Sequence, residues 1–390
     1  MSMHSGDLHQ EASQENYPVK TDAWMLLIPV MLTICGLFMI ASITMDMAEQ
    51  KYQQPFYYLF RQGIFALVSW ATGLAIFRFV PIRFWFRMNG LLLLFSLWLL
   101  IVVLIPGAGV KVNGSLRWLD FQVIRFQPAE LLKISLLAYL AGYLSKHSDR
   151  IKHQRIVPLE PLLVFALITF LLSMQPEFTA VFILFAVMLS LFIAGGLAWR
   201  WLMAFFVTGV MLLATLVYHQ PYRLKRLSAV LDPWSRPLDE GYQITQALLA
   251  IGRGDWLGTG LGNSIQKSFY LPEAHTDFLF AIMVEELGTL SGCIMIVLFT
   301  ILVIRIMMLA IRAKRLSMFF TYYFVLGIAI LFTMQIIVNL GVNLGIMPVT
   351  GLPLPFLSYG GSHLLITVML TGVCLRADYE IGIREHASDV

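Results

Sequence analysis

The sequence predicts an all-α, polytopic integral membrane protein with about ten transmembrane helices and one long outer loop. Of its 390 residues, 58% are hydrophobic and only 13% are charged, whereas soluble chains carry roughly 25% charged residues. The mean hydropathy is +0.77. Aromatic residues make up 13% of the chain, which suits lipid-facing and interfacial surface and excludes a disordered or nucleic-acid-binding chain.

Ten apolar stretches are long enough to span a bilayer, whose hydrocarbon core of about 30 Å needs about 20 helical residues. They cover residues 24–43, 57–78, 88–105, 126–145, 159–175, 178–198, 201–218, 277–304, 317–345 and 355–376. Residues 175–177 alone separate the fifth and sixth stretches, which predicts a tight helical hairpin. No charged residue occurs from Leu316 to Leu375, and the prolines at 348–355 divide this run into two helices.

The distribution of Lys and Arg predicts the orientation. Short loops after even-numbered helices hold twelve of these residues, and those after odd-numbered helices hold four. The even loops and both termini are therefore expected in the cytoplasm. This gives a cytoplasmic tail at 1–22, a single transmembrane domain at 23–378 and a second cytoplasmic tail at 379–390. The long loop 219–276 lies outside, where we expect binding or chemistry.

Several alternatives are excluded by what the sequence lacks. Cys35, Cys293 and Cys374 lie in apolar runs without the spacing of a disulfide framework or a zinc site. The polar first 22 residues do not resemble a cleavable signal peptide, so we expect the first apolar run to anchor the chain. No GxxxxGK[ST] motif occurs, which argues against ATP as an energy source.

Ionisable residues at membrane depth are costly and are therefore functional candidates. Glu130 and Lys133 lie three residues apart on one helix face. They form either a self-satisfying pair that joins helices or a polar lining for an anionic substrate. Glu177, in the predicted hairpin, is expected to form a structural ion pair with an Arg or to cap a helix.

The densest group of motif residues runs from Gly241 to Gly288. Its glycines permit tight turns and close backbone approach, but no βαβ unit surrounds them, so a dinucleotide fingerprint is excluded. Asp277 is expected in the first turn of a helix at the outer rim. It is either a carboxylate favoured by the helix dipole or a semi-buried general base. His275 is expected to be a hydrogen-bonded structural residue, and Glu285 and Glu286 should meet positive partners.

Six cations mark the long outer loop: Arg223, Lys225, Arg226, Arg236, Arg253 and Lys267. Such a cluster near a membrane is typical of contact with lipid head groups. The alternative is recognition of a pyrophosphate, for which the guanidinium fork is well suited.

These residues occur in four motifs that together resemble the SEDS family, and its cell-division branch more than its elongation branch. The motifs are RWLDFQVIRFQPAELLKI, PYRLKRLSAVLDPW, the segment 241–288 and LPFLSYGGS, and the resemblance extends from about residue 24 to about residue 380. It implies a ten-helix glycosyltransferase that polymerises lipid II at the outer face of the bacterial cytoplasmic membrane. It also implies a class B penicillin-binding protein and other division proteins as partners, at the septum.

The resemblance also assigns roles to individual residues. The essential aspartate of the family corresponds to Asp277, and the Gln-Pro-Ala-Glu carboxylate corresponds to Glu130. The nearby family lysine corresponds to Lys133, and the motif Arg and Trp to Arg117 and Trp118. Asp277 is therefore the expected catalytic residue. Substrate contacts are expected from Lys133, Glu130, Arg117, Trp118, Arg223, Arg226, Glu177 and His275.

Three positions depart from the family pattern. Glu177 and Phe178 stand where members commonly have Asp-Leu, so the acid is one methylene longer. The segment from Pro348 to Gly351, with Val349 and Thr350 inside it, lacks the lysine of the usual Pro-Thr-Lys-Gly. This raises the importance of Lys133 and of the Arg223 cluster for phosphate contact. His363 replaces a small polar residue.

We expect an inverting transfer in which Asp277 accepts the proton of the acceptor hydroxyl and undecaprenyl pyrophosphate leaves. Either a cationic surface (Lys133, Arg117, Arg223 and Arg226, in this order) or a divalent cation such as Mg²⁺ or Mn²⁺ would neutralise the leaving group. A lipid II flippase and a non-enzymatic division scaffold are the alternatives. The polar residues gather at the outer rim and the tails are short, which disfavours both.

Overall fold

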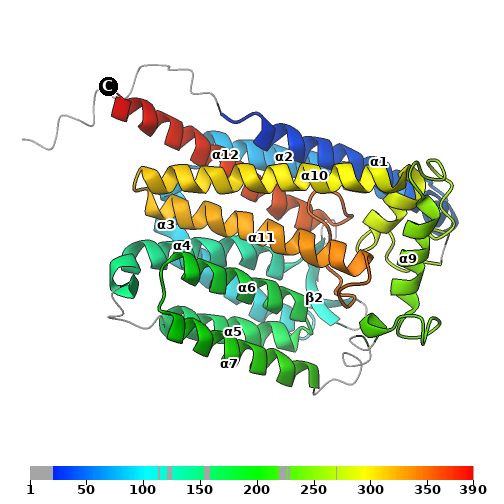
Figure 1. Ribbon diagram of the computed structural model, residues 1–390, viewed down its shortest axis with the longest axis horizontal. Helices are drawn as coiled ribbons and strands as arrows, with labels where there is room; N and C mark the ends of the chain where they lie inside the picture. The colour runs from blue at the N-terminus through cyan, green and yellow to red at the C-terminus, as the bar shows by residue number, and fades with distance from the viewer. Residues whose placement is uncertain are drawn as a thin grey trace, which may run out of the picture.

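The computed structural model describes residues 21–112, 115–120, 125–152, 159–218, 226, 229–268 and 270–389. Within these ranges, ten long helices form one bundle, and the shorter helix α9 lies across one end of it (Figure 1). The long helices are α1 (Trp24–Tyr52), α2 (Tyr57–Phe79), α3 (Ile82–Leu104), α4 (Pro128–Lys152), α5 (Leu159–Met174), α6 (Phe178–Ala194), α7 (Trp199–Tyr218), α10 (Leu279–Arg315), α11 (Phe319–Asn343) and α12 (Gly361–Asp389). The α9 helix (Tyr242–Gly254) belongs to the predicted outer loop.

The ten long helices coincide with the ten predicted apolar stretches, which confirms the predicted fold class. By length and composition α1, α2, α3, α10 and α11 are able to cross a membrane, and α5, α6 and part of α7 are shorter apolar helices. The α5–α6 connection is as tight as expected, because α5 ends at Met174 and α6 begins at Phe178.

The helix ends differ from the predicted ends where charge or proline intervenes. The α12 helix begins at Gly361 rather than 355, because residues 351–354 form no regular structure and residues 355–359 form turns and bends after the prolines. It continues to Asp389 rather than 376, since Arg312 of α10 pairs with Asp378 at 2.7 Å and with Glu385 at 2.6 Å. A count of apolar residues predicts that a helix ends at its first charged residues. The α12 helix continues past them because those residues have ionic partners.

A small antiparallel sheet, which the sequence did not predict, follows α3. Its strands are β1 (Gly109–Val112), β2 (Ser115–Asp120) and β3 (Arg125–Phe126), in the order β1-β2-β3. Trp118 is opposite Val110 in the β1–β2 ladder. Leu119 is buried against the end of α3. The sheet thereby fixes Arg117 at the end of the bundle near the α5–α6 connection.

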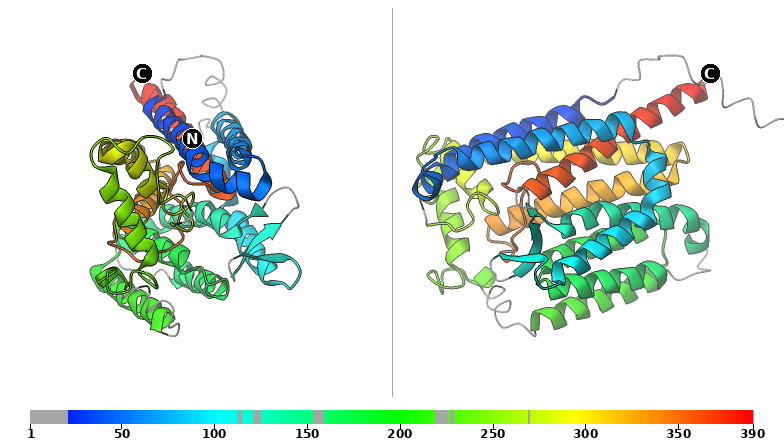
Figure 2. Two further views of the ribbon diagram at one scale, coloured as in Figure 1. Left: turned by 90° about the vertical axis from the view of Figure 1, so that its right-hand side faces the viewer. Right: turned by 180° about the vertical axis from the view of Figure 1, so that it is seen from behind.

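The helices α1, α2 and α12 lie together on one side of the bundle, and α5 and α7 lie on the opposite side (Figure 2). Small residues bring α2 and α12 together, since a Cβ atom on Gly372 would lie 2.3 Å from the carbonyl oxygen of Gly73. Close backbone approach through small residues is a common way to pack helices in membranes, where the hydrophobic effect contributes little.

The glycine-rich segment packs its backbone directly on a kink in α10. Gly258 has a φ of +79° and Gly288, inside α10, has a φ of +83°. A Cβ atom on Gly288 would lie 2.2 Å from the carbonyl oxygen of Trp256. The Thr259 N–H donates to the Glu285 carbonyl at 2.9 Å. These glycines therefore serve close approach, as the sequence predicted, and fix the outer loop against the helix that begins beside Asp277.

Candidate active site

Asp277 lies in the turn that leads from the outer loop into α10, two residues before the helix begins. The sequence predicts Asp277 in the first helical turn, and this prediction is wrong by two residues. Its main-chain carbonyl accepts hydrogen bonds from the side-chain amides of Asn339, at 3.0 Å, and Asn343, at 2.9 Å. Both asparagines are on α11 and buried, so a rigid helix fixes the position of the aspartate backbone.

The Asp277 side chain is 8% exposed. Within the described part of the chain, its carboxylate has no hydrogen bond and no ion pair. Burial and then the nearby Glu273 raise the pKa of this carboxyl to about 7, against the opposing charge of Arg226. A buried carboxyl whose pKa is close to neutral can accept a proton during turnover. Such an environment suits a general base, which is one of the two alternatives that the sequence left open.

Arg226 is the described cation that faces Asp277. Its Nη1 donates to the carbonyl oxygen of Val349 at 2.8 Å. The segment from Pro348 to Gly351, which lacks the family lysine, is thus held by an arginine from the outer loop. Arg223 and Lys225 lie outside the described residues.

A second polar cluster involves α4 and α12. Lys133 donates to Glu130 at 2.6 Å, and Nδ1 of His363 lies 3.2 Å from the other Glu130 oxygen. All three side chains are buried, with exposed fractions of 4–5%. Glu130 and Lys133 thus form the self-satisfying pair that the sequence allowed, and His363 joins it.

Glu177 lies beside this cluster, directly before α6. Its carboxylate accepts a hydrogen bond from the side-chain amide of Gln127, and Oε2 has no partner among the described residues. Burial raises the pKa of this carboxyl to about 7. The prediction that it would pair with an arginine or cap a helix is wrong. Arg117 lies near it but donates to the carbonyls of Gln175, at 2.9 Å, and Pro176, at 2.6 Å, so among the described residues the acid forms no ion pair and its side chain caps no helix.

The segment 348–351 connects the two clusters. On one side, the Thr179 hydroxyl donates to the Thr350 carbonyl at 2.9 Å, and Thr179 is two residues from Glu177. On the other side, the Cβ position of Gly351 is 3.8 Å from Oδ2 of Asp277. Two carboxyls with pKa values near 7 therefore flank one short segment.

Among the described residues, the side-chain contacts of His275 and the strand pairing of Trp118 are with residues other than Asp277. The His275 ring contacts the rings of Tyr58, at 5.7 Å, and Tyr359, at 5.5 Å. Burial lowers the pKa of this imidazole, which favours its neutral form. Its Nδ1 has no hydrogen-bond partner within the described ranges, whereas its main-chain carbonyl accepts from the Tyr359 N–H at 3.0 Å, so the expected hydrogen bond is made by the backbone and not by Nδ1. Trp118 is half-buried in the β1–β2 ladder.

Two of the six loop cations pair with glutamates of α10, and the buried one, Lys267, is structural, which corrects its assignment to head groups or pyrophosphate. Lys267 pairs with Glu286 at 2.8 Å, and both side chains are buried. Arg253 pairs with the buried Glu285 at 2.9 Å. The expectation that both glutamates meet positive partners is confirmed. Removing one partner of a buried pair is costly, so these pairs hold the loop on α10.

Sequence reasoning missed the residues that hold the Asp277 backbone. Asn339 and Asn343 are four residues apart in a mostly apolar helix, a spacing that puts both on one face. This pattern could have identified them. Within the described residues, no three His, Cys, Asp or Glu side chains are grouped as a metal site would require.

Comparisons with known proteins agree with this architecture. The FtsW/RodA/SpoVE family, described as cell cycle proteins, matches residues 23–381. A probable peptidoglycan glycosyltransferase FtsW from Nitrosococcus halophilus is 44% identical over 360 residues, 92% of each chain. The FtsW relative from Hahella chejuensis is 41% identical over 378 residues, 97% of this chain and 95% of its own.

Solved structures show the same fold. A chain of a peptidoglycan synthase complex that coordinates polymerization and crosslinking matches with a TM-score of 0.73 and 28% identity, covering 93% of this chain and 98% of its own. The rod shape determining protein RodA of Thermus thermophilus matches with a TM-score of 0.66 and 26% identity, covering 92% and 96%. The chain described here belongs to the FtsW/RodA/SpoVE family of cell cycle proteins.

Proposed function

We propose that this protein is a peptidoglycan glycosyltransferase that polymerises lipid II, with Asp277 as its general base. The observation that carries the proposal is the buried Asp277 carboxylate with a pKa of about 7, held by two asparagines on its backbone and without a partner on its side chain among the described residues. The names of the relatives, probable peptidoglycan glycosyltransferases, support the reaction class.

The reaction is a single displacement. Asp277 accepts the proton of the acceptor's GlcNAc 4-hydroxyl as the oxygen attacks the anomeric carbon of the donor MurNAc. The bond from that carbon to the diphosphate oxygen breaks, and undecaprenyl diphosphate leaves with the electron pair. The configuration at the anomeric carbon inverts. A positioned base contributes roughly 10²- to 10⁴-fold to such a rate.

The contacts change the order of the cations that stabilise the leaving group. Lys133, the first expected candidate, is buried against Glu130, so its charge is already compensated. Arg117 is engaged by two carbonyls. Arg226 lies close enough to Asp277 to affect its pKa and is therefore the first candidate for the diphosphate. Lys133, Glu130 and Arg117 become positioning residues that fix α4 and the α5–α6 connection.

Location and partner follow from the same proposal. Both termini are in the cytoplasm, as the Lys and Arg distribution predicts, and Asp277 faces outward. The site of action is the division septum, which the FtsW names of the relatives support. The partner is a class B penicillin-binding protein that crosslinks the strands. The similarity to a chain of a peptidoglycan synthase complex supports it.

The test is polymerisation of purified lipid II by protein reconstituted in liposomes with its penicillin-binding partner. Wild type should make glycan strands, and Asp277→Asn should make none while staying folded. Asp255→Asn is the matched control, because Asp255 is an exposed carboxylate on the same outer loop, and it should retain wild-type activity. Full activity in folded Asp277→Asn would refute the assignment of the base.

A further inference from the structure

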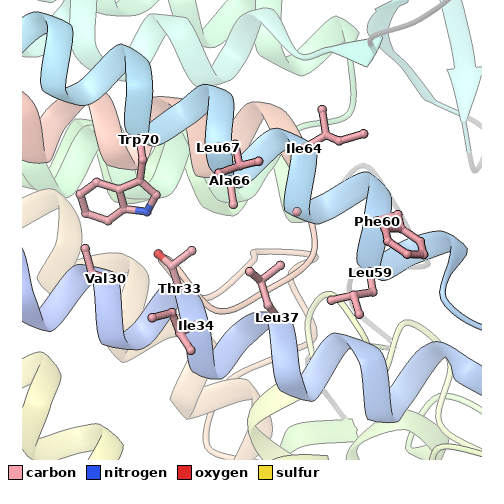
Figure 3. A pocket seen from close by; sticks show the side chains of 11 residues that line it. Val30, Thr33, Ile34, Leu37, Leu59, Phe60, Ile64, Ala66, Leu67 and Trp70 are labelled. Carbon is pink, nitrogen blue, oxygen red and sulfur yellow. The ribbon is translucent and has the colours of Figure 1, made fainter.

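A groove of about 530 Å³ runs along the bundle surface between α1 and α2 (Figure 3). Val30 and Leu37 line it from α1, and Leu59, Ile64 and Trp70 line it from α2. Thr33 is the one lining residue with a hydroxyl, and that hydroxyl donates to the Pro29 carbonyl. The groove therefore offers an apolar surface to an apolar occupant.

The groove has the length of one bilayer leaflet. From Leu59 to Trp70 the helix rises roughly 16 Å at 1.5 Å per residue, about half of a hydrocarbon core of about 30 Å. On α2 it begins at Leu59, near the start of that helix, at the end of the bundle that holds Asp277. Its occupant is therefore a chain that belongs to the leaflet on the Asp277 side.

A cluster of aromatic rings lies at this end of the groove. We call Tyr52, Tyr57, Tyr58 and Tyr359, together with His275, the tyrosine cluster. Tyr52 and Tyr57 stack at 4.0 Å, and Tyr58 contacts Tyr57 at 5.5 Å and Tyr359 at 5.5 Å. His275 joins the cluster to the turn that holds Asp277, two residues further on. Tyrosine rings offer rigid, amphipathic contact area, which suits the mixed polar and apolar faces of a sugar.

Arg61 lies on α2 beside the start of the groove, one helical turn after Tyr57 and Tyr58. It follows Phe60, which lines the groove, and it is half-buried. Burial raises the pKa of the Tyr359 phenol, and Arg61 opposes that shift, which puts its guanidinium within electrostatic reach of the tyrosine cluster. Among the described residues Arg61 makes no hydrogen bond and no ion pair. A guanidinium in this setting is suited to a phosphate.

We propose that the groove, Arg61 and the tyrosine cluster form a binding site for a polyprenyl-diphosphate-linked saccharide. The polyprenyl chain lies in the groove, the diphosphate contacts Arg61 and the sugar packs on the tyrosine cluster. The apolar chain, the diphosphate and the sugar thus each meet a matching surface. This inference rests on the proposed function, because it takes lipid II as the saccharide carrier.

The three surfaces should differ in their contribution to binding. Lipid tails are about as apolar as the groove, so the groove acts through shape and van der Waals packing and not through the hydrophobic effect. Blocking it should weaken binding severalfold. Loss of one charge-assisted contact to the diphosphate should weaken binding about tenfold.

The experiment measures binding of lipid II by native mass spectrometry, in the Asp277→Asn background so that no ligand is consumed. Gly63→Leu fills the groove, because a Cβ atom on Gly63 has nothing within 4 Å. Gly90→Leu is its control, an equally open helical glycine on α3. Arg61→Gln removes the cation, with Arg87→Gln, an exposed arginine on α3, as control. We expect weaker lipid II binding in Gly63→Leu and in Arg61→Gln, and unchanged binding in the two control variants.

Two further probes identify the ligand. Tyr57→Ala should remove the preference for lipid II over undecaprenyl diphosphate, and Tyr270→Ala, an exposed tyrosine of the outer loop, should preserve it. Phosphatidylglycerol binding should not change in any variant. Lipid II binding that is unchanged in both Gly63→Leu and Arg61→Gln would overturn the site, and an equal loss of phosphatidylglycerol would show a general phospholipid groove. Failure of the wild type to polymerise, with these binding differences intact, would refute the proposed function alone.

Discussion

The Cβ position of Gly351 lies 3.8 Å from Oδ2 of Asp277, and Gly351 has a φ of +73°. A residue with a side chain at this position would be strained by about 1 kcal/mol and would put a methyl group beside the carboxylate. The glycine thus leaves space on the side of Asp277 where a substrate hydroxyl has to approach.

Gly351→Ala should therefore lower kcat/KM by at least about tenfold, because small displacements near a catalytic group are costly. Gly107→Ala is the matched control: Gly107 has a φ of +91° and nothing within 4 Å of its Cβ position. Both variants should lose similar thermal stability, measured by differential scanning fluorimetry in detergent. Equal activity in the two variants would show that the space beside Asp277 has no role.

The raised pKa of Asp277 predicts how the rate depends on pH. Only the deprotonated carboxylate can accept a proton, so kcat should fall as the pH drops through about 7. The measurement is the initial rate of polymerisation from about pH 5.5 to about pH 9, a range that brackets this pKa, with stability monitored in parallel. A rate that stays constant across the acidic half of this range would contradict the buried setting of the carboxylate and its lack of a partner among the described residues.

The same shift predicts a pH-dependent stability. The pKa rises from 3.8 to about 7 on folding, so ionisation of Asp277 destabilises the folded state. This loss begins above the unfolded pKa, grows as the pH rises and is complete above about 7; it amounts to roughly 4 kcal/mol at about 1.4 kcal/mol per unit. Asp277→Asn should unfold at a higher temperature than wild type at about pH 8, and the difference should shrink toward about pH 4.5. A difference that grows as the pH falls would contradict this sign.

The sequence predicted the ten helices well, because each apolar stretch must satisfy its backbone within a helix inside the bilayer. It predicted the Glu130–Lys133 pair and positive partners for Glu285 and Glu286, and it singled out Asp277 as the candidate base. It did not predict that Lys267 is buried with Glu286, or that Arg117 binds carbonyls, since a positive charge looks the same on a surface and in a core. These outcomes depend on which segments meet in space, and a linear pattern does not specify that.

Divalent cations are expected to affect the rate through the substrate. Near Asp277, the cation found in the described part of the chain is Arg226, and one of its nitrogens is engaged by Val349. One guanidinium leaves much of a diphosphate's charge unbalanced, so a cation carried by the diphosphate should complete the neutralisation. EDTA should lower the polymerisation rate severalfold, and Mg²⁺ or Mn²⁺ should restore it. An unchanged rate in EDTA would show that the protein alone neutralises the charge of the diphosphate.

The buried Glu130–Lys133 pair permits a test that separates a structural role from a catalytic one. Glu130→Gln removes the negative partner of an ammonium that is 4% exposed, and breaking a buried pair in this way costs roughly 3–5 kcal/mol. The double variant Glu130→Gln, Lys133→Met removes both charges and should regain most of the lost thermal stability. If the pair only positions α4, polymerisation should recover with stability. A stable but inactive double variant would instead show that Lys133 or Glu130 contacts the substrate directly.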